Sequence, residues 1–388
     1  MSTNHQALYT LLIECCRHES DDHKLEYFAG QISDWAGFLE SSYTHGVYPL
    51  VAKSLKSIHA VPEHIKSVLK ITNLDIARRN MTMTAELLRI MKLLEENGIS
   101  ALAIKGPVLS QMIYGDITQR QFADLDILVQ EKDLYRTVEL LCDNGFVSEH
   151  SIKFLKNKEL LQVLKDFSIM RPSQNISIEI HWKLFLQSQI KNDYLHYFYQ
   201  NSNKVIINNY YIKTLDHNSL ILYLILHGSK HMWERLEWIA DVDRLARNKD
   251  ADWDNILTSA RRMKSEQLFN LGIVVCRELF STPFPVRILE NSEAMHSVLN
   301  PKSLILGDLF SNSIVKGDLV LHDEINYIFF EDIYKSQWIY KLILFYRAFT
   351  RLDPDDFYTI NLPRYLAFFY RFIHLFHVAH RMISNKYK

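Results

Sequence analysis

The sequence lacks cysteines spaced for metal binding or for disulfide bridges, and it lacks a strong net charge. None of its four cysteines (Cys15, Cys16, Cys142 and Cys276) has C-x-x-C spacing, and the adjacent pair is a poor structural bridge. This usage fits a reducing compartment, and we expect the protein to be cytoplasmic. The formal net charge is −1 and the pI is about 7.0, so no broad basic surface is available to hold a nucleic-acid backbone. Nucleic acid is therefore not an expected partner.

A long apolar run is missing as well. The N-terminus has no basic region followed by a clean apolar run, and we expect no transmembrane segment. The nearest candidate, residues 365–382, is rich in aromatic side chains but is interrupted by Arg371, His374, His377 and His380. We interpret it as a terminal packing helix, with a helix that binds a membrane surface or a partner as the alternative. No repeat, heptad run, low-complexity tract or Rossmann glycine fingerprint is found.

The composition is that of a folded protein with more than one structural unit. With 388 residues, 48% of them apolar, the chain can form two or three units and a sizeable core. Residues 1–98 are predicted to be helical, and the last of these helices, Asp75–Glu96, should pack on a sheet. Residues 99–190 are predicted to form an α/β core. Beyond Gln187 the pattern predicts helices only, so residues 191–388 are expected to form a helical C-terminal domain.

Residues 99–129 contain most of the functional information. Ser100–Ile104 is small and apolar, as a buried strand should be, and it runs directly into Lys105-Gly106-Pro107. Gly106 tolerates backbone dihedrals that other residues resist, and proline suits a first helical position because its missing N–H would have no partner there. The sequence thus predicts a strand-to-helix turn. The free N–H groups of that helix, beside the Lys105 ammonium, would form an anion-binding site.

Two aspartates lead into the next predicted strand, residues 125–129. Side chains alternate faces along a strand, so Asp124 and Asp126 point the same way while Leu125 points into the core. Two carboxylates in one small volume raise a pKa unless a cation lies between them, and Mg²⁺ prefers such oxygen ligands together with substrate phosphates. The alternative is an aspartate pair that only caps a turn, because short motifs often occur by chance.

A third carboxylate is found in residues 176–182. This segment alternates apolar and polar residues, the period-two pattern of a strand, and Glu179 and His181 share its polar face. If this strand lies beside the aspartate strand, Glu179 is either a metal ligand or a general base toward an acceptor hydroxyl. Residues 162–171 are predicted to pair with it through a turn at residues 172–175. The alternative is an amphipathic edge strand with a solvated glutamate and histidine.

Two histidines lie four residues apart in a later helical segment. His227 and His231 would share a helix face, with the spacing found in H-E-x-x-H zinc proteases. Gly228 stands where that motif has its glutamate, and no third ligand is evident. Packing or substrate contact is therefore favoured over zinc.

Lys230, Arg235 and Asp241 in the same segment are better candidates for function. If this helical region closes over the sheet, Lys230, His231 or Asp241 should reach the ligand held by the aspartate pair. A cation there could meet phosphates, and a carboxylate could position an acceptor. The alternative is an ordinary charged helix surface.

Together these motifs resemble a known family. The chain is similar to the nucleotidyltransferase superfamily with the DNA polymerase beta type of fold. The similarity lies in Lys105-Gly106, then Arg120, then Asp124-x-Asp126 on a strand. More narrowly, the chain resembles bacterial uncharacterised nucleotidyltransferases, whose members share K-G, R-x-x-x-D-x-D, E-x-H-W, H-x-x-x-H and W-x-x-D. The resemblance covers roughly residues 85–250. It departs from the superfamily at the turn, where Lys105-Gly106-Pro107 replaces the usual Gly-Ser, so backbone N–H groups and Lys105 would grip the triphosphate.

The resemblance implies a mostly helical α+β protein, in which a small mixed β-sheet core lies between helical N- and C-terminal regions. It implies that Asp124, Asp126 and Glu179 hold Mg²⁺ or Mn²⁺ against the phosphates of an NTP donor. Residues expected to contact the ligands are Lys105, Gly106, Arg120, His181, Lys230, His231 and Asp241. A nucleoside monophosphate would pass to a hydroxyl or phosphate of an unidentified small-molecule or peptide acceptor. Two alternatives are a degenerate member that binds a nucleotide or phosphorylated ligand without turnover, and a helical interaction protein.

Overall fold

The computed structural model describes residues 3–185, 198–199 and 201–293, together with residue 357 and parts of residues 362–376. Over these ranges the protein is mostly helical and contains a four-stranded mixed sheet and a separate two-stranded sheet. This is the α+β class predicted from the sequence. The predicted division of the chain near residues 98 and 190 stays a prediction.

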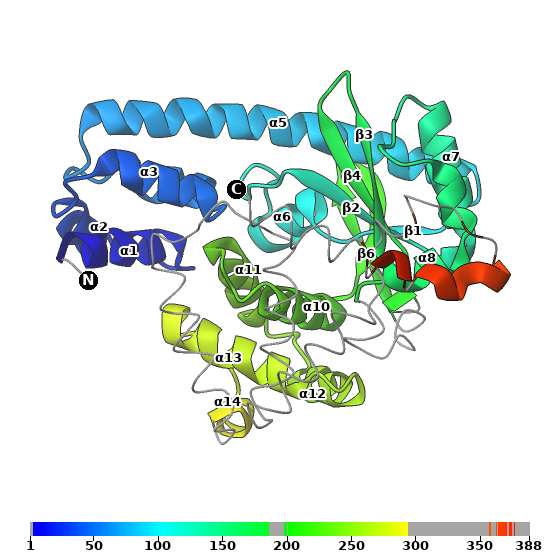
Figure 1. The fold of residues 1–388 in the computed structure, drawn as a ribbon. Coiled ribbons are helices and arrows are strands. Elements are labelled where there is room, and N and C mark those ends of the chain that lie inside the picture. Colours follow the sequence, from blue (N-terminus) through cyan, green and yellow to red (C-terminus); the bar gives the residue numbers. More distant parts are fainter. Residues whose placement is uncertain are drawn as a thin grey trace.

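One long helix connects the N-terminal helices to the sheet (Figure 1). The elements are α1 (Thr3–Cys16), α2 (Asp22–Ala29), α3 (Trp35–Thr44), α4 (Tyr48–Ser54) and α5 (Glu63–Glu96). Helix α5 begins at Glu63 and not at the predicted Asp75, because its first half also has buried residues. Ile65 and Leu69 belong to the core that contains the N-terminal helices, whereas Leu87 belongs to the core against the sheet. Helix α5 therefore takes part in both cores.

The larger sheet has the mixed topology predicted for it. Its strand order is β1-β2-β4-β3, with β1 (Ala101–Ala103), β2 (Asp124–Val129), β3 (Asp166–Arg171) and β4 (Ile176–His181). Strands β2 and β4 are parallel, and the other two pairs are antiparallel. The predicted hairpin between β3 and β4 is present, with Asn175 in its turn at a φ of 53°. The strand predicted to begin at residue 162 begins at Asp166 instead, because residues 158–163 form helix α8 (Lys158–Val163), which Asn157 caps.

The two faces of this sheet have different surroundings. Leu125, Ile127 and Val129 pack in one core with α5 and with α7 (Leu134–Asp143). Leu128 of the same strand belongs to the other core, which contains α6 (Gly106–Tyr114) and α10 (His217–Lys230). Since side chains alternate along a strand, Asp124 and Asp126 lie on the face of Leu128, toward α6 and α10.

The prediction of helices alone beyond Gln187 is wrong. Strands β5 (Ser202–Ile207) and β6 (Tyr210–Leu215) form an antiparallel hairpin before the helices resume. Its turn is Asn208-Asn209, and both residues have positive φ, 49° and 63°. Asparagine is among the residues that tolerate this conformation, and primed hairpin turns require it. The Asn-Asn pair is therefore the sequence signal that the helical interpretation misses.

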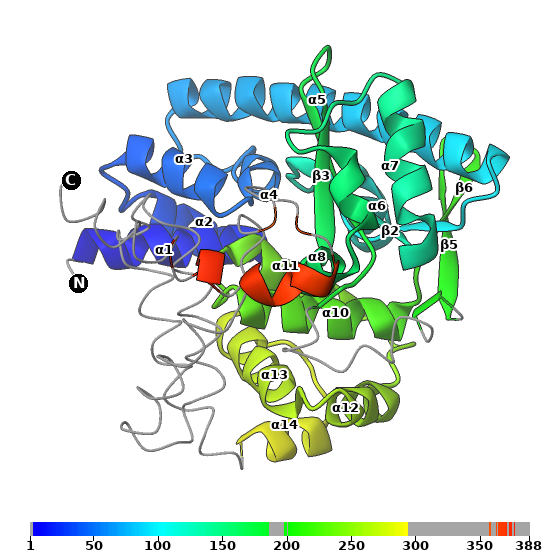
Figure 2. The ribbon, with the colours of Figure 1, turned by 45° about the vertical axis from the view of Figure 1, so that its right-hand side comes forward.

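The C-terminal helices lie below the sheet in Figures 1 and 2 and pack against the N-terminal helices. They are α10, α11 (Leu236–Ala246), α12 (Trp253–Arg262), α13 (Glu266–Phe280) and α14 (Val286–Glu293). Phe38 and Val51 from the N-terminal side share one apolar cluster with Leu236 and Phe280. Among the described residues, no helix is both long enough and apolar enough to pass through a membrane.

The predicted terminal helix at residues 365–382 is described only in part. Its start is a 3-10 helix, η5 (Arg364–Phe369), and most of the remainder lies outside the described residues. Tyr370 is buried and packs with Phe357 and with Leu160 of α8. This contact agrees with a packing role for at least one aromatic side chain of the segment.

Candidate active site

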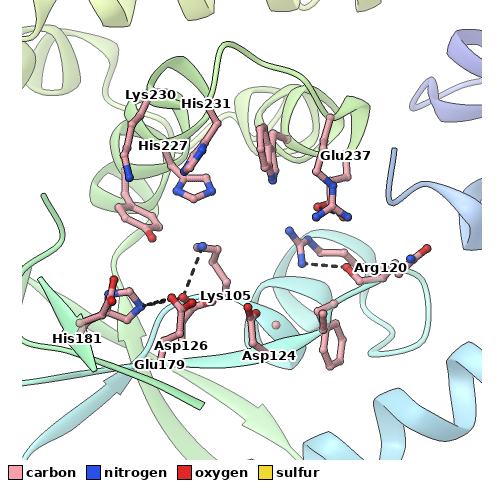
Figure 3. Close-up of a pocket in the computed structure, with 18 of the residues that line it drawn as sticks. Lys105, Arg120, Asp124, Asp126, Glu179, His181, His227, Lys230, His231 and Glu237 are labelled. Atoms are coloured by element: carbon pink, nitrogen blue, oxygen red, sulfur yellow. Dashed lines mark hydrogen bonds and ion pairs between the residues drawn. The ribbon is translucent and has the colours of Figure 1, made fainter. Parts of the chain in front are cut away.

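A cavity of about 550 Å³ lies between the sheet face that carries the aspartates and the helices α10 and α11. This volume is within the range of roughly 300–1,000 Å³ that small-molecule sites occupy. Six predicted residues line it from the sheet side: Lys105, Gly106, Asp124, Asp126, Glu179 and His181. Arg120, Lys230 and His231 line it from other directions. Figure 3 shows His227, His231 and Lys230 on the opposite side of the cavity from the carboxylates of the sheet.

Three carboxylates meet on one face of the sheet. Asp124 and Asp126 share a face of β2, and the parallel register places Asp126 directly opposite Glu179 of β4. Asp126 is only 4% exposed, whereas the Glu179 side chain is one-third exposed, at 34%. The alternation of side chains along each strand is predicted from its own sequence. The pairing of the two strands then brings the third carboxylate beside the first two.

Asp126 is neutralised by two partners on a single oxygen. Its Oδ1 lies 2.9 Å from His181 Nε2 and 3.5 Å from Lys105 Nζ. Burial alone would raise the pKa of Asp126, but Lys105 and the hydrogen bond from His181 outweigh it and lower the pKa below its usual value. Asp126 is thus a carboxylate at neutral pH. Among the described contacts of Asp126, none is made by Oδ2.

Asp124 has the opposite electrostatic character. Burial, followed by the charges of Asp126 and Glu179, raises its pKa from 3.8 to about 6, although Lys105 and Arg120 act in the other direction. An additional cation would therefore stabilise the ionised form of Asp124. Because the charge of Asp126 raises the pKa of Asp124, a cation bound between the two carboxylates would lower the pKa of Asp124.

The turn between β1 and α6 has the predicted conformation. Gly106 begins the helix at a φ of 58°, a left-handed value that favours glycine, and proline occupies the first turn. The Lys105 side chain is 16% exposed and lies 5.8 Å from the ring centroid of Tyr223. Burial lowers the pKa of Lys105, but the nearby carboxylates, above all Asp126, raise it by more than burial lowers it. The ammonium therefore stays charged. The turn thus presents a fixed cation beside the start of a helix.

His181 connects Asp126 to a second ion pair that the sequence did not reveal. Its Nε2 also lies 3.3 Å from Glu179 Oε2, and its Nδ1 lies 3.7 Å from Asp166 Oδ2. Asp166 is paired with Lys165, and both line the cavity. Burial disfavours the imidazolium, but hydrogen bonds to Asp126 and Glu179 raise the pKa of His181 above its usual value. The register of β3 against β4, which places Asp166 opposite His181, creates this cluster.

The predicted histidine pair belongs to a cluster of aromatic rings with tilted and edge-on contacts. His227 and His231 have ring centroids 4.8 Å apart, and each lies 5.3 Å from the ring of Trp238. The ring of Tyr223 extends this cluster, with its centroid 5.8 Å from that of His227. Burial, followed by the charges of Lys105 and His231, lowers the pKa of His227 well below its usual value, so its imidazole is neutral. This cluster of rings forms an aromatic wall across the cavity from the carboxylates of the sheet.

Asp241 does not line the cavity, although the sequence placed it near the acceptor. It is fully buried, and its Oδ2 accepts a 2.9 Å hydrogen bond from Arg120 Nε. Arg120 Nη1 also donates to the carbonyl oxygen of Gln121 at 3.2 Å. The helical position of Asp241 could be predicted, but the direction of its side chain depends on Arg120 and on how α11 packs against the loop before β2.

Arg235 and Glu237 form a further charged pair at the start of α11. Arg235 Nη2 lies 3.1 Å from Glu237 Oε1, and the Glu237 side chain is 6% exposed. Gly46, at a φ of 71°, packs so closely that an added Cβ would collide with the Glu237 carboxylate. Burial raises the pKa of Glu237, although Arg120 and Arg235 oppose this effect. Sequence spacing singled out Arg235 but gave no sign of Glu237, because its environment comes from the N-terminal helices.

The donor set on the sheet fits a divalent cation. Among the described residues, one group of three potential ligand atoms lies close enough to hold a metal, with all atoms within 4.8 Å, and it consists of Asp126, Glu179 and His181. The hydrogen bond from His181 to Asp126 suits a histidine that orients a ligand, because the imidazole Nε2 then carries a proton. Asp126 Oδ2 and the carboxyls of Asp124 and Glu179 are the remaining hard oxygen ligands, which is what Mg²⁺ and Mn²⁺ prefer.

The site thus combines two carboxylates on one strand, a third on its parallel neighbour and a cationic glycine turn beside them. The chain belongs to the family described as uncharacterised nucleotidyltransferase, whose model matches residues 31–281. This confirms the resemblance found in the sequence motifs and extends it to α3 and α4 on the N-terminal side and through α13 on the C-terminal side. No protein with a curated description matches the chain.

Proposed function

We propose that the protein is a metal-dependent nucleotidyltransferase that transfers a nucleoside monophosphate from an NTP to a hydroxyl or phosphate group of an acceptor. The observation that carries this proposal is the register of β2 and β4. It places Asp126 opposite Glu179, with Asp124 on the same face, in a cavity next to the Lys105-Gly106 turn. Family membership supports the same general chemistry.

The three carboxylates would hold Mg²⁺ or Mn²⁺. When bound, the cation would offset the charge of the phosphates during transfer. His181 keeps Asp126 in place through the hydrogen bond at Oδ1 and leaves Oδ2 for the ion. The raised pKa of Asp124 supports this assignment, because a carboxyl that is destabilised as an anion gains most from a nearby cation.

The donor triphosphate would lie between the sheet and α10. Lys105 and the backbone N–H groups at Gly106 would bind it from one side, and Lys230 is positioned to meet it from the other. The aromatic wall formed by Tyr223, His227, His231 and Trp238 would border the triphosphate on the side away from the sheet. Arginine and lysine charges fixed before the reaction stabilise developing negative charge without reorganisation.

The test uses the full-length chain and labelled nucleotides. Each of the four NTPs, labelled at the α-phosphate, is incubated with Mg²⁺ or Mn²⁺ and a cell extract, and the modified product is identified by mass spectrometry. We expect label transfer that requires metal and is lost in Asp126→Asn. Absence of metal-dependent nucleotide binding in the wild-type protein would contradict the proposal.

A further inference from the structure

Five of the lysines and arginines that line the cavity form two groups on different sides of the carboxylates, and Arg79 belongs to neither group. The first is a lysine group, Lys105, Lys165 and Lys230, whose members all act on the imidazole of His227. The second is an arginine group, Arg120 and Arg235, whose charges lower the pKa of the Glu237 carboxyl more than that of Lys105 does. The lysine group lies beside β1 and β3 and at the end of α10, whereas the arginine group lies in the loop before β2 and at the start of α11.

Asp124 lies between the two groups. Lys105 and Arg120 are the two cations that lower its pKa, so both are within electrostatic reach of its carboxyl. In Figure 3, Asp124 is drawn between Asp126 and Arg120, and Lys230 lies at the opposite end of the cavity from Glu237. A reaction centred on the aspartates would therefore have lysines on one side and arginines on the other.

Arg120 is anchored but keeps donors for a ligand. A guanidinium carries five N–H donors in a planar fork. Asp241 takes the one at Nε and the carbonyl of Gln121 takes one at Nη1, and within the described part of the chain Nη2 makes no further hydrogen bond. The side chain is 6% exposed and lines the cavity. An arginine held at Nε in this way presents its Nη edge in a fixed direction, which suits bidentate recognition of carboxylate or phosphate.

We infer that Arg120, oriented by Asp241, binds an anionic group of the acceptor, a carboxylate or a phosphate, separately from the donor triphosphate. The inference rests on the proposed function. In an in-line transfer at the α-phosphate, the leaving pyrophosphate and the attacking acceptor lie on opposite sides of the phosphorus. The lysine group would bind the leaving pyrophosphate. The arginine group would then face the side from which the acceptor attacks. Asp241 is a positioning residue that acts through Arg120.

The test measures a second anion on the nucleotide-bound protein. The full chain is saturated with Mn²⁺ and with the non-hydrolysable α,β-methylene analogue of whichever of the four NTPs binds most tightly, and is then titrated calorimetrically with inorganic phosphate or with acetate. We expect one anion to bind while the nucleotide stays bound. Tighter binding of phosphate indicates a phosphorylated acceptor, and tighter binding of acetate indicates a carboxylate-bearing one.

Variants assign that anion to Arg120. The double substitution Arg120→Gln/Asp241→Asn removes both buried charges together, which avoids leaving one of them unpaired. We expect it to weaken anion binding by at least about tenfold, the usual scale for a lost charge-assisted hydrogen bond, with nucleotide affinity within about threefold of wild type. The single variant Asp241→Asn should weaken anion binding less, because Arg120 is still present but no longer oriented.

Arg247 and Asp243 provide the matched control. They form an ion pair at the C-terminal end of α11, at 2.9 Å and with a fully buried aspartate, and neither lines the cavity. Arg247→Gln/Asp243→Asn should leave anion affinity unchanged. The inference is overturned if no anion binds in the millimolar range, if the Arg120 double variant binds it normally, or if that variant loses the nucleotide instead. Failure of the wild type to bind nucleotide with Mn²⁺ would reject the proposed function, and it is measured first.

Discussion

Asp126 and Glu179 lie directly opposite each other on two parallel strands, and the same register places His181 of the second strand beside Leu128 of the first. The pairing brings a carboxylate from each strand to one edge of the cavity. The hydrogen bond from His181 crosses back to Asp126 at 2.9 Å. Substitutions at these positions therefore test the arrangement as a unit.

Asp124→Asn and Asp126→Asn should each abolish turnover and leave the fold intact. Removing one carboxylate weakens metal binding, and the rate should fall by at least about a hundredfold, as when a preorganised electrostatic contact is lost. Label transfer from α-labelled NTP and circular dichroism measure the two effects. Asp116→Asn is the control, because Asp116 bonds Thr118 locally and does not line the cavity. Wild-type rates in either active-site variant would reject the catalytic assignment.

Asp124→Asn should also stabilise the metal-free protein at neutral pH. The folded-state pKa of Asp124 is raised from 3.8 to about 6, so its acid form is favoured by folding and stability falls as the pH rises through that interval. At pH 7.5 the variant should gain about 1–2 kcal/mol over wild type, within the scale of such a shift. At pH 4.5, where Asp124 is already protonated, the gain should disappear. Thermal melts at both values, with chelator present, provide the comparison, and a gain of equal size at both pH values would show that ionisation of Asp124 is not its cause.

Gly106→Ala should weaken nucleotide binding more than it weakens the fold. Its φ of 58° is unfavourable for alanine by about 1–2 kcal/mol, and relief of that strain would move the turn beside Lys105. Gly115, at the other end of α6, is the control, because it has a similar φ of 67° and open space around it. We expect both alanine variants to lose similar thermal stability and only Gly106→Ala to lose affinity for the NTP. Equal affinities would argue against a phosphate-binding role for the turn.

The purified protein should contain no stoichiometric zinc. The rings of His227 and His231 pack against Trp238, and in the described part of the structure they have no third ligand within the distances that a metal needs. Elemental analysis after dialysis measures the metal content directly. One zinc per chain that disappears in His227→Ala would overturn this expectation and assign the pair a metal.

The parts of the site that can be predicted are those set by short-range chemistry. Strand alternation places Asp124 and Asp126 on one face, and glycine with proline indicates the turn at Gly106. The pairing of Glu179 with Asp126 is expected from the resemblance, and the strand register confirms it. Each of these features depends on neighbouring residues or on a known motif.

The parts that the sequence does not reveal depend on packing between distant segments. Glu237 resembles an ordinary helix residue until the N-terminal helices bring Gly46 against it. Asp241 is predicted near the acceptor because it lies in a charged segment, but its side chain turns toward Arg120. The β5–β6 hairpin is hidden in a segment predicted to be helical, because its alternation is short and only its turn residues indicate it. No local hydrophobic pattern contains the information that fixes these three features.

The apolar cluster shared by the N-terminal and C-terminal helices has a consequence for synthesis on the ribosome. Arg17 on the N-terminal side donates to the carbonyl oxygen of Leu279 at 3.1 Å, across 262 positions of the chain. The first helices emerge long before the residues that cover them, and domains form as their sequence becomes available. Their apolar faces are thus uncovered during most of translation. A nascent chain stalled before α10 should be a better chaperone substrate than one stalled after α13, as ribosome profiling of chaperone-bound chains would measure.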